Sequence, residues 1–390
     1  MDAPARSWIS SSDGLADIAR TALTAPWVAL DTEANSMFVY RERVCLLQLN
    51  LGGSLALIDT LALNAPQDDA GVRTPSSALS ALRQACEDPA LTLYLHGGEY
   101  DVGCLKRDYG ISLRGVWDSQ QAASMLGWEK TGYGAVVEKV CGVVLDKAYT
   151  QYDWATRPLA AGAERYALDD VIFLPQVCEH LRGLVAAADL DEEVTIANQA
   201  VEATTWSGGF DPAGFWRIKG VREVPPQSLG VLTALYAWRD ALAKIANLPP
   251  GRLLNNEVLL VLARQVPTNF QLLKKLGLRS WFLGAHGEAL IQALRSAAST
   301  PPAVPPRPRQ REVAPEEEER EARLKDWRRG EAERRTRAEE RAVPLQVVLP
   351  AKALEYLKQH GADQLEQVPQ LGGKRIARYG DKLTELCRRS

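Results

Sequence analysis

Three short apolar runs follow one another near the start of the chain, and they limit the folds that it can adopt. They cover residues 27–33 (WVALDTE), 44–50 (VCLLQLN) and 54–60 (SLALIDT). Each run is bounded by turn or loop residues, as buried strands are. Their close succession predicts hairpin-linked, antiparallel pairing, and a fourth run at 91–96 predicts another strand of the same sheet.

Helical segments follow these strands. Helical spacing recurs over residues 76–86, 99–109, 119–127, 133–141 and 162–186. Strands and helices mixed in this way predict an α/β domain with a mixed sheet, which we place at residues 1–215. After residue 228 the pattern is almost wholly helical, with segments at 228–245, 256–264, 269–276 and 286–296. We therefore expect a compact helical domain over residues 221–298.

The last quarter of the chain changes composition twice. Residues 301–308 are rich in proline, and residues 316–341 are a dense mixture of Glu and Arg. We interpret residues 299–342 as a linker, in which the charged part is a solvated, mobile single helix or is disordered. Residues 343–390 recover apolar periodicity and predict a last small helical unit that is too short to be very stable alone.

The net charge of −3 hides an asymmetry between the two halves of the chain. Residues 1–220 hold 17 basic and 29 acidic side chains, whereas residues 221–390 hold 29 basic and 20 acidic ones. A protein whose whole surface binds a polyanion is therefore not indicated, but a basic second half is. The two halves are expected to do different jobs.

Cysteine and histidine usage points to a reduced protein without structural zinc. The six cysteines contain no CxxC pair, and the four histidines have no zinc-ligand spacing. The N-terminus lacks the apolar core of a signal peptide, and no run reaches the roughly 18–20 apolar residues of a membrane span. We expect a cytoplasmic protein that does not bind membranes.

Carboxylates gather around the predicted sheet. Asp31 and Glu33 are two apart at the end of the first strand and so project to one face. Asp101 begins a helix directly after the strand at 91–96, and Tyr166 and Asp170 are four apart on another helix. The neighbouring Asp169 and Glu99 are interpreted as peripheral, and His96 as a core or supporting residue.

Four carboxylates at one sheet edge would repel one another unless cations neutralised them. Oxygen ligands without histidine or thiolate select Mg²⁺ or Mn²⁺. Two such ions, about 3.5–4 Å apart, can hold the attacking and leaving oxygens of a phosphodiester in line. The sequence therefore predicts a phosphodiester-cleaving site with two divalent cations.

These segments resemble a known family. Asp31-Thr32-Glu33, the segment 96–101 and the Tyr166–Asp170 pair are similar to the three exonuclease motifs of the DEDDy 3'-to-5' exonucleases, and specifically to those of the ribonuclease D group. The segments 117–123 (WDSQQAA), 145–147 (LDK) and 153–159 (DWATRPL) resemble that group's sequence between its second and third motifs. The resemblance implies a ribonuclease H-like (DnaQ-like) exonuclease fold.

The second half resembles the helical domain shared by RecQ-type helicases and ribonuclease D, known as HRDC. The similarity rests on segments at 236–239 (YAWR), 248–250 (LPP), 255–257 (NNE) and 260–263 (LVLA). Residues 371–380 (LGGKRIARYG) resemble the end of a second, incomplete domain of the same type. Two complete tandem domains do not fit, because fewer than 50 residues follow the charged segment.

The resemblance also implies roles. Asp31, Glu33 and Asp170 would hold one metal ion, and Asp31 with Asp101 the other. Tyr166 would orient the attacking water, and Glu33 would also bond the terminal 3'-hydroxyl.

Contacts to the nucleic acid are expected from aromatic and basic side chains. For Trp154 and Arg157, locking their loop onto the sheet is an equal alternative. For any single lysine, a solvated helix face is the favoured interpretation over a phosphate contact. The N–H groups at Gly372-Gly373 could also meet a phosphate. The expected contacts are Tyr40, Arg41, Trp154, Arg157, Lys274, Lys275, Lys374 and Arg375.

The sequence thus predicts a metal-dependent 3'-to-5' exoribonuclease that releases mononucleotides from RNA. The resemblance implies stable RNA precursors such as tRNA as substrates, and a monomer is favoured. Two alternatives stay open at this point. One is the same chemistry on DNA, and the other is a non-catalytic RNA-binding adaptor with a decayed site.

Overall fold

The computed structural model describes residues 6–63, 68–69, 72–73, 75–301 and 314–388. The chain divides into two units. The first combines Met1–Ala34, Arg43–Trp206 and Glu312–Ser390, and the second combines Asn35–Glu42 and Ser207–Arg311. In the described part of the chain, no helix has the length and apolar character needed to cross a membrane.

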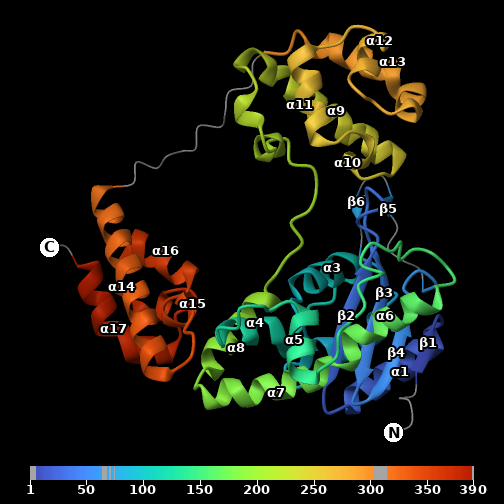
Figure 1. Cartoon of the computed structure of the whole chain (residues 1–390). Helices are drawn as coiled ribbons and strands as arrows, with labels where there is room; N and C mark the ends of the chain where they lie inside the picture. The colour runs from blue at the N-terminus through green and yellow to red at the C-terminus, as the bar shows by residue number, and fades with distance from the viewer. Residues whose placement is uncertain (1–5, 64–67, 70–71, 74, 302–313, 389–390) are drawn as a thin grey trace. The chain divides into compact units, whose positions relative to one another are not determined.

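The first unit contains a six-stranded mixed sheet (Figure 1). Its strands are β1 (Arg6–Ile9), β4 (Ser54–Ile58), β3 (Val44–Leu51), β2 (Val28–Ala34), β7 (Leu93–Leu95) and β8 (Val116–Asp118), in this order across the sheet. β2 pairs antiparallel with β3, and β3 with β4, whereas the other neighbours are parallel. The antiparallel pairing predicted for the first three apolar runs is confirmed.

The two faces of β2 and β3 are covered by different helices. Val28 and Leu30 belong to one apolar cluster with residues of α1 and α3, whereas Ala29 packs with residues of α6 and α7 on the opposite face. Figure 1 shows α6 lying across β2 and β3. The helices of this domain are α1 (Ser12–Thr24), α2 (Arg83–Cys86), α3 (Glu99–Tyr109), α4 (Ser119–Met125), α5 (Tyr133–Cys141), α6 (Ala161–Ile172), α7 (Leu174–Ala187) and α8 (Asp191–Glu202).

Two predicted helices differ from the structure. The segment 162–186 forms α6 and α7 instead of one helix, because Pro175 lacks the N–H that a continuous helix would need there. The segment 76–86 forms only a 3₁₀ turn (Ser80–Leu82) and the four-residue α2. A small hairpin of β5 (Asp68–Asp69) and β6 (Val72–Arg73) lies outside the main sheet.

The C-terminal helices pack on α7 and α8 of the domain that bears the sheet. They are α14 (Pro315–Glu339), α15 (Leu345–Val348), α16 (Ala351–His360) and α17 (Gly373–Cys387), with a 3₁₀ turn at Leu365–Gln367. Val347 and Leu383 share an apolar cluster with Val177 of α7 and Val194 of α8. The small unit over 343–390 therefore has a core in common with the domain that bears the sheet.

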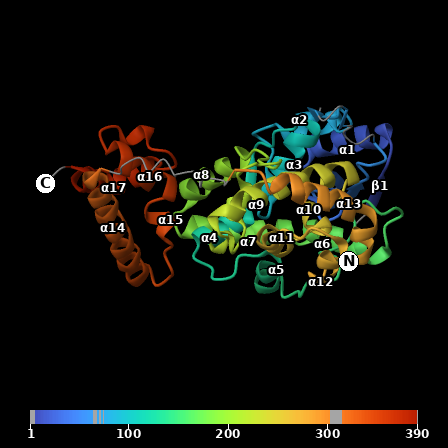
Figure 2. The same cartoon turned by 90° about the horizontal axis from the view of Figure 1, so that it is seen from above.

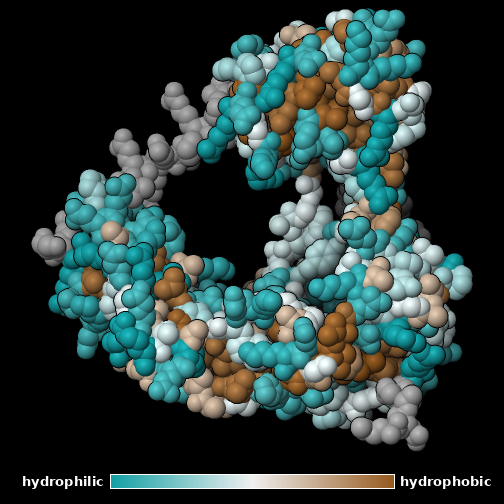
Figure 3. Space-filling view, in the orientation of Figure 1, coloured by the Kyte–Doolittle hydropathy of each residue, from teal (hydrophilic) through white to brown (hydrophobic). Residues whose placement is uncertain are grey.

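The prediction of a linker over residues 299–342 is wrong for its charged second part, which forms α14. Leu324, Ala332 and Arg335 of α14 are buried against the C-terminal helices, so the charged helix is not a mobile single helix. Its other side is hydrophilic (Figure 3). Most of the proline-rich part, residues 302–313, lies outside the described residues.

The second unit is helical. It contains α9 (Pro226–Ala246), α10 (Pro250–Leu253), α11 (Asn256–Gln265), α12 (Phe270–Lys275) and α13 (Ser280–Ala297), and 3₁₀ turns at Gly214–Arg217 and Val221–Glu223. Figure 2 shows α9, α11 and α13 from above. Their core includes Leu235, Leu262 and Phe282. Segment 35–42, which directly follows β2, also belongs to this unit.

Candidate active site

The site begins on β2, the strand between β3 and β7. Strand alternation places Asp31 and Glu33 on the same face as Ala29, which packs against α6. α6 in turn rests on the sheet through Ala163, Ala167 and Val171, which recur every four residues. This packing fixes the helix directly over the two carboxylates.

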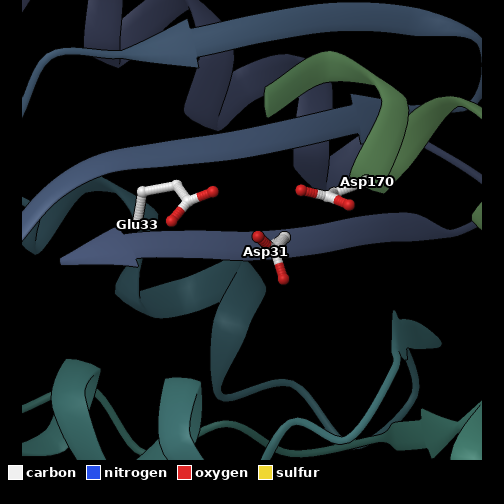
Figure 4. Close-up of side chains that lie close together, drawn as sticks. All are labelled: Asp31, Glu33 and Asp170. Atoms are coloured by element: carbon white, nitrogen blue, oxygen red, sulfur yellow. The ribbon is translucent and has the colours of Figure 1, made fainter. Parts of the chain in front are cut away.

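Asp170 of α6 completes a group of three carboxylates. Asp31, Glu33 and Asp170 each offer one oxygen, and these atoms all lie within 4.8 Å of one another. The three side chains point toward one another from β2 and α6 (Figure 4). The structure thus brings together three of the four predicted metal ligands.

Asp101, the fourth predicted ligand, lies beside this group and is bonded to the strand. It is buried in the first turn of α3. Its Oδ1 accepts hydrogen bonds from the backbone N–H of Thr32 at 3.1 Å and from Thr32 Oγ1 at 2.5 Å. Because Thr32 lies between Asp31 and Glu33, these bonds tie α3 to β2 at the carboxylate group. Asp101 lies near enough for its charge to raise the pKa of Asp31.

The carboxyl groups hold their protons more strongly than usual. Burial, followed by the charges of Asp170 and Asp101, raises the pKa of Glu33 to about 9. Burial and the charges of Asp169 and Asp101 raise the pKa of Asp170 to about 7. Burial raises the pKa of Asp101 to about 6, and the bonds from Thr32 limit the rise.

Asp31 is surrounded by the other three carboxylates, whose negative charges act on it. Burial and the charges of Asp101, Asp170 and Glu33 raise its pKa well above the ordinary range. A cation among these oxygens would remove the repulsion. The three grouped donors are all carboxylates, a set that suits a hard divalent ion such as Mg²⁺ or Mn²⁺. The donor set therefore fits the metal chemistry predicted from the sequence.

Tyr166 lies one helical turn before Asp170 and is partly buried. Burial and the negative charges of Asp170, Glu33 and Asp31 raise its pKa, so the phenol keeps its proton at neutral pH. Its ring packs beside Tyr149 and Trp154, with centroid distances of 6.2 and 6.0 Å. A protonated, oriented hydroxyl beside the carboxylates can position a water molecule.

Supporting residues hold the segments that carry these groups. The Asp118 carboxylate accepts from the N–H of Gly98 at 2.7 Å and thereby fixes the turn before α3. The Tyr133 hydroxyl donates to the carbonyl oxygen of Asp169 at 3.1 Å and ties α5 to α6. We assigned neither residue a role from the sequence. Tyr133 opens a helix expected there, but nothing in its spacing shows the contact with α6.

His96 has the supporting position expected for it. Its Nδ1 lies 2.8 Å from Ser119 Oγ, and its ring centroid lies 5.1 Å from that of Tyr133. Burial lowers its pKa.

Trp154 and Arg157 lock their loop onto the sheet. The Trp154 side chain is buried, and the Arg157 guanidinium donates to both carboxylate oxygens of Asp59 at 2.8 Å. It also donates to the carbonyl oxygens of Cys45 at 2.7 Å and of Trp154 at 2.8 Å. Of the two interpretations of this segment, the structure favours the locking role, because the guanidinium is already fully engaged.

Arg375 is not an RNA contact of the kind expected. It is only 2% exposed, and its guanidinium donates to the carbonyl oxygens of Gln346, Val347, Gln370 and Leu371. An arginine in this position stabilises the packing of α17 on α15.

The start of α17 is occupied by a carboxylate of the same chain. Glu192 of α8 accepts from the N–H of Gly373 at 2.8 Å and of Lys374 at 2.7 Å. The Lys374 ammonium in turn pairs with Asp189 at 2.7 Å. The site expected to meet a phosphate therefore holds α8 and α17 together.

The remaining predicted contacts lie in the second unit. The Tyr40 hydroxyl donates to Asp240 Oδ2 at 2.8 Å, and the Arg41 N–H donates to Asn247 Oδ1 at 3.4 Å. Lys274 and Lys275 are exposed in the last turn of α12. These two lysines retain the exposure that a phosphate contact needs.

Comparison with known proteins agrees with the geometry. Residues 7–186 match the model of a 3'-5' exonuclease domain, and residues 228–294 match that of the HRDC domain. Ribonuclease D of Granulibacter bethesdensis is 30% identical over 318 residues, which are 79% of this chain and 76% of that protein. Ribonuclease D of Pseudomonas paraeruginosa is 30% identical over 80% of this chain and 81% of its own length.

The fold is also similar to that of Escherichia coli RNase D, with a TM-score of 0.65 at 23% identity over 98% of each chain. It is similar as well to the catalytic core of RRP6 from Trypanosoma brucei, with a TM-score of 0.66 at 22% identity over 75% of this chain and 80% of that one. The ribonuclease H-like fold and the HRDC domain predicted from the sequence are confirmed. The chain therefore belongs to the ribonuclease D family of 3'-5' exoribonucleases.

Proposed function

We propose that this enzyme trims 3' extensions from structured stable RNA, such as tRNA precursors, one mononucleotide at a time. The observation that carries the proposal is the group of three carboxylates under α6, with Asp101 and Tyr166 beside it. Escherichia coli RNase D is an exoribonuclease involved in structured RNA processing, and this property of a relative supports the same substrate class here.

Exonuclease domains of this family depend on metal, and the acidic cluster is the matching donor set. We assign Mg²⁺ or Mn²⁺ to it, with Asp31, Glu33 and Asp170 holding one ion and Asp31 with Asp101 the other. When bound, such ions lower the pKa of water and stabilise the charge on the scissile phosphate. Asp101 keeps an oxygen for this purpose, because both Thr32 bonds go to its Oδ1.

The chain's own groups position the reactants. The Tyr166 hydroxyl orients a water molecule toward the terminal phosphorus, and Glu33 accepts a hydrogen bond from the terminal 3'-hydroxyl. The water oxygen bonds to phosphorus as the bond to the 3'-oxygen of the preceding nucleotide breaks. The products are a nucleoside 5'-monophosphate and an RNA that is one nucleotide shorter, with a new 3'-hydroxyl.

The substitution Asp31→Asn tests this assignment. On a 3'-extended tRNA we expect the wild type to shorten the extension with Mn²⁺ and to be inactive without it. The variant should fail in both conditions, while its binding to the same RNA stays near the wild-type value. Asp169→Asn is the matched control, because Asp169 lies next to Asp170 but outside the carboxylate group. Near-normal turnover by Asp31→Asn would contradict the proposal.

Matched 3'-labelled RNA and DNA strands test the sugar preference. The proposal expects faster shortening of RNA, and equal rates on both would support the DNA alternative. The adaptor alternative falls away, because the chain belongs to an enzyme family and retains every carboxylate of the motifs. A monomeric state and a cytoplasmic location stay predictions.

A further inference from the structure

Gln48 of β3 is a buried amide without partners, located beside the carboxylate group. Its side chain is fully buried. Neither its Nε2 nor its Oε1 makes a hydrogen bond, and among the buried side-chain amides of the described residues no other is left unpartnered at both ends. Buried polar atoms are nearly always hydrogen-bonded, so an amide in this state needs an explanation.

The strand register places Gln48 directly opposite Asp31. The β2–β3 ladder pairs Asp31 with Gln48 and Glu33 with Leu46. Residues directly opposite each other in an antiparallel pair share a face, with Cβ atoms about 4.5–5.5 Å apart. The Gln48 amide therefore reaches toward the face of the sheet that bears the Asp31 carboxylate.

The same face lies under the helix that carries Asp170. Asn50, two residues after Gln48, donates from Nδ2 to the carbonyl oxygen of Val171 at 3.0 Å. Its Oδ1 accepts from the N–H of Gly53 at 2.9 Å. One strand thus presents two buried amides to one face, and the amide nearer the carboxylates is the one without partners.

Packing alone does not account for a glutamine at this position. The other residues of β3 are apolar, apart from Asn50, whose amide nitrogen and oxygen each make a hydrogen bond. Leucine or methionine would fill a similar volume without burying two polar atoms. Carboxylates that ligate metals are commonly held by further hydrogen bonds, which orient them.

We propose that Gln48 is a positioning residue for the metal centre: its amide donates a hydrogen bond to the Asp31 carboxylate when the cations are bound. The inference rests on the proposed cation site. It adds a residue to that site which supplies no ligand oxygen but fixes the orientation of the shared ligand. Replacing Gln48 by an apolar residue should therefore raise the stability of the metal-free protein and lower its affinity for the cations.

The test compares Gln48→Met with wild type and with the control Asn50→Leu, all without RNA. In chelator-containing buffer we expect the melting midpoint of Gln48→Met to be about 2–4 °C higher than that of wild type, since two unpartnered polar atoms are gone. The midpoint of Asn50→Leu should fall, because the Val171 carbonyl and the Gly53 N–H lose their partner. Mn²⁺ affinity, measured by titration calorimetry, should fall about 10–100-fold for Gln48→Met and stay near wild type for Asn50→Leu.

Unchanged Mn²⁺ affinity with a lowered midpoint in Gln48→Met would overturn the proposal and leave Gln48 a packing residue. Failure of both Gln48→Met and Gln48→Leu to fold would overturn it as well, because the glutamine would then be needed for the fold itself. If wild type binds no Mn²⁺, the cation site fails together with this inference. If wild type binds it and Gln48→Met binds it equally, only the role of Gln48 fails.

Discussion

Replacing Asp170 by asparagine removes one negative charge from the carboxylate group and should change how stability depends on pH. The pKa of Asp170 is about 7, compared with an ordinary value of 3.8. Between these two values the folded chain binds a proton that the unfolded chain has released. The free energy of unfolding therefore falls as pH rises through this window, and the loss is complete above pH 7.

The size of the effect follows from the shift. A rise of about three pKa units corresponds to about 4 kcal/mol at 1.36 kcal/mol per unit. Asparagine does not ionise, so the Asp170→Asn variant does not lose this free energy of unfolding as the pH rises. In metal-free buffer at pH 8.5 we expect Asp170→Asn to exceed wild type in stability by up to about 4 kcal/mol, and at pH 4 the two proteins should nearly agree.

The assay is urea unfolding in the presence of a chelator, followed by pulse proteolysis and mass spectrometry of peptides from β2 and α6. This readout isolates the domain that bears the site from the helical second unit. Glu164→Gln is the control, because it removes a carboxylate from the same helix at a position outside the group. It should keep the pH dependence of wild type.

Addition of Mg²⁺ at pH 8.5 completes the experiment. It should stabilise wild type and Glu164→Gln but have a much smaller effect on Asp170→Asn, which lacks a ligand. Equal loss of stability in wild type and Asp170→Asn between pH 5 and 8.5 would refute the reasoning. It would show that burial and the neighbouring negative charges do not raise the pKa of Asp170 in the folded chain.

Three further predictions concern the residues around the site and the RNA. Arg157→Lys should lower the free energy of unfolding by about 2 kcal/mol, because lysine cannot reproduce the two bonds to Asp59; an unchanged urea midpoint would contradict this. Glu192→Gln should loosen α17 by about 0.5–1 kcal/mol, measured as faster proteolysis of the C-terminal helices; equal cleavage rates would argue against the helix-terminus contact. Replacing Lys274 and Lys275 together by alanine should reduce the slope of log affinity for single-stranded RNA against log salt by about 1.4, measured by fluorescence anisotropy, and an identical slope would remove α12 from the RNA-binding surface.

The placement of the candidate residues within each motif could be predicted from the sequence because it depends on two short periodicities. Side chains alternate along a strand, which puts Asp31 and Glu33 on one face, and residues four apart share a helix face, which puts Tyr166 beside Asp170. Neither relation depends on distant parts of the chain. Gln48 was missed because alternation along β3 does not relate it to Asp31 on β2; the register between the two strands is needed to set the two residues opposite each other.

The misassigned basic residues show what local patterns cannot supply. Arg375 recurs with Tyr379, Leu383 and Cys387 at four-residue intervals on the buried face of α17, so its burial had a signal in the sequence. What the sequence did not show is that carbonyl groups would converge on the guanidinium and make its burial possible. A basic side chain on an apolar face is therefore ambiguous until its acceptors are known.

The basic second half of the chain does not contribute all of its positive charges to an RNA-binding surface, because several of them are buried or paired. Arg335 and Arg375 are buried within the C-terminal helices, and Lys374 is paired with Asp189. Such charges contribute little to a phosphate-binding surface, because a salt-bridged or carbonyl-bonded cation must give up its partner before it can bind RNA. Exposed cations of the HRDC domain, such as those in the last turn of α12, face no such cost. We therefore expect the salt dependence of RNA binding to reside mainly in the HRDC domain, and the C-terminal helices to act through their packing on α8.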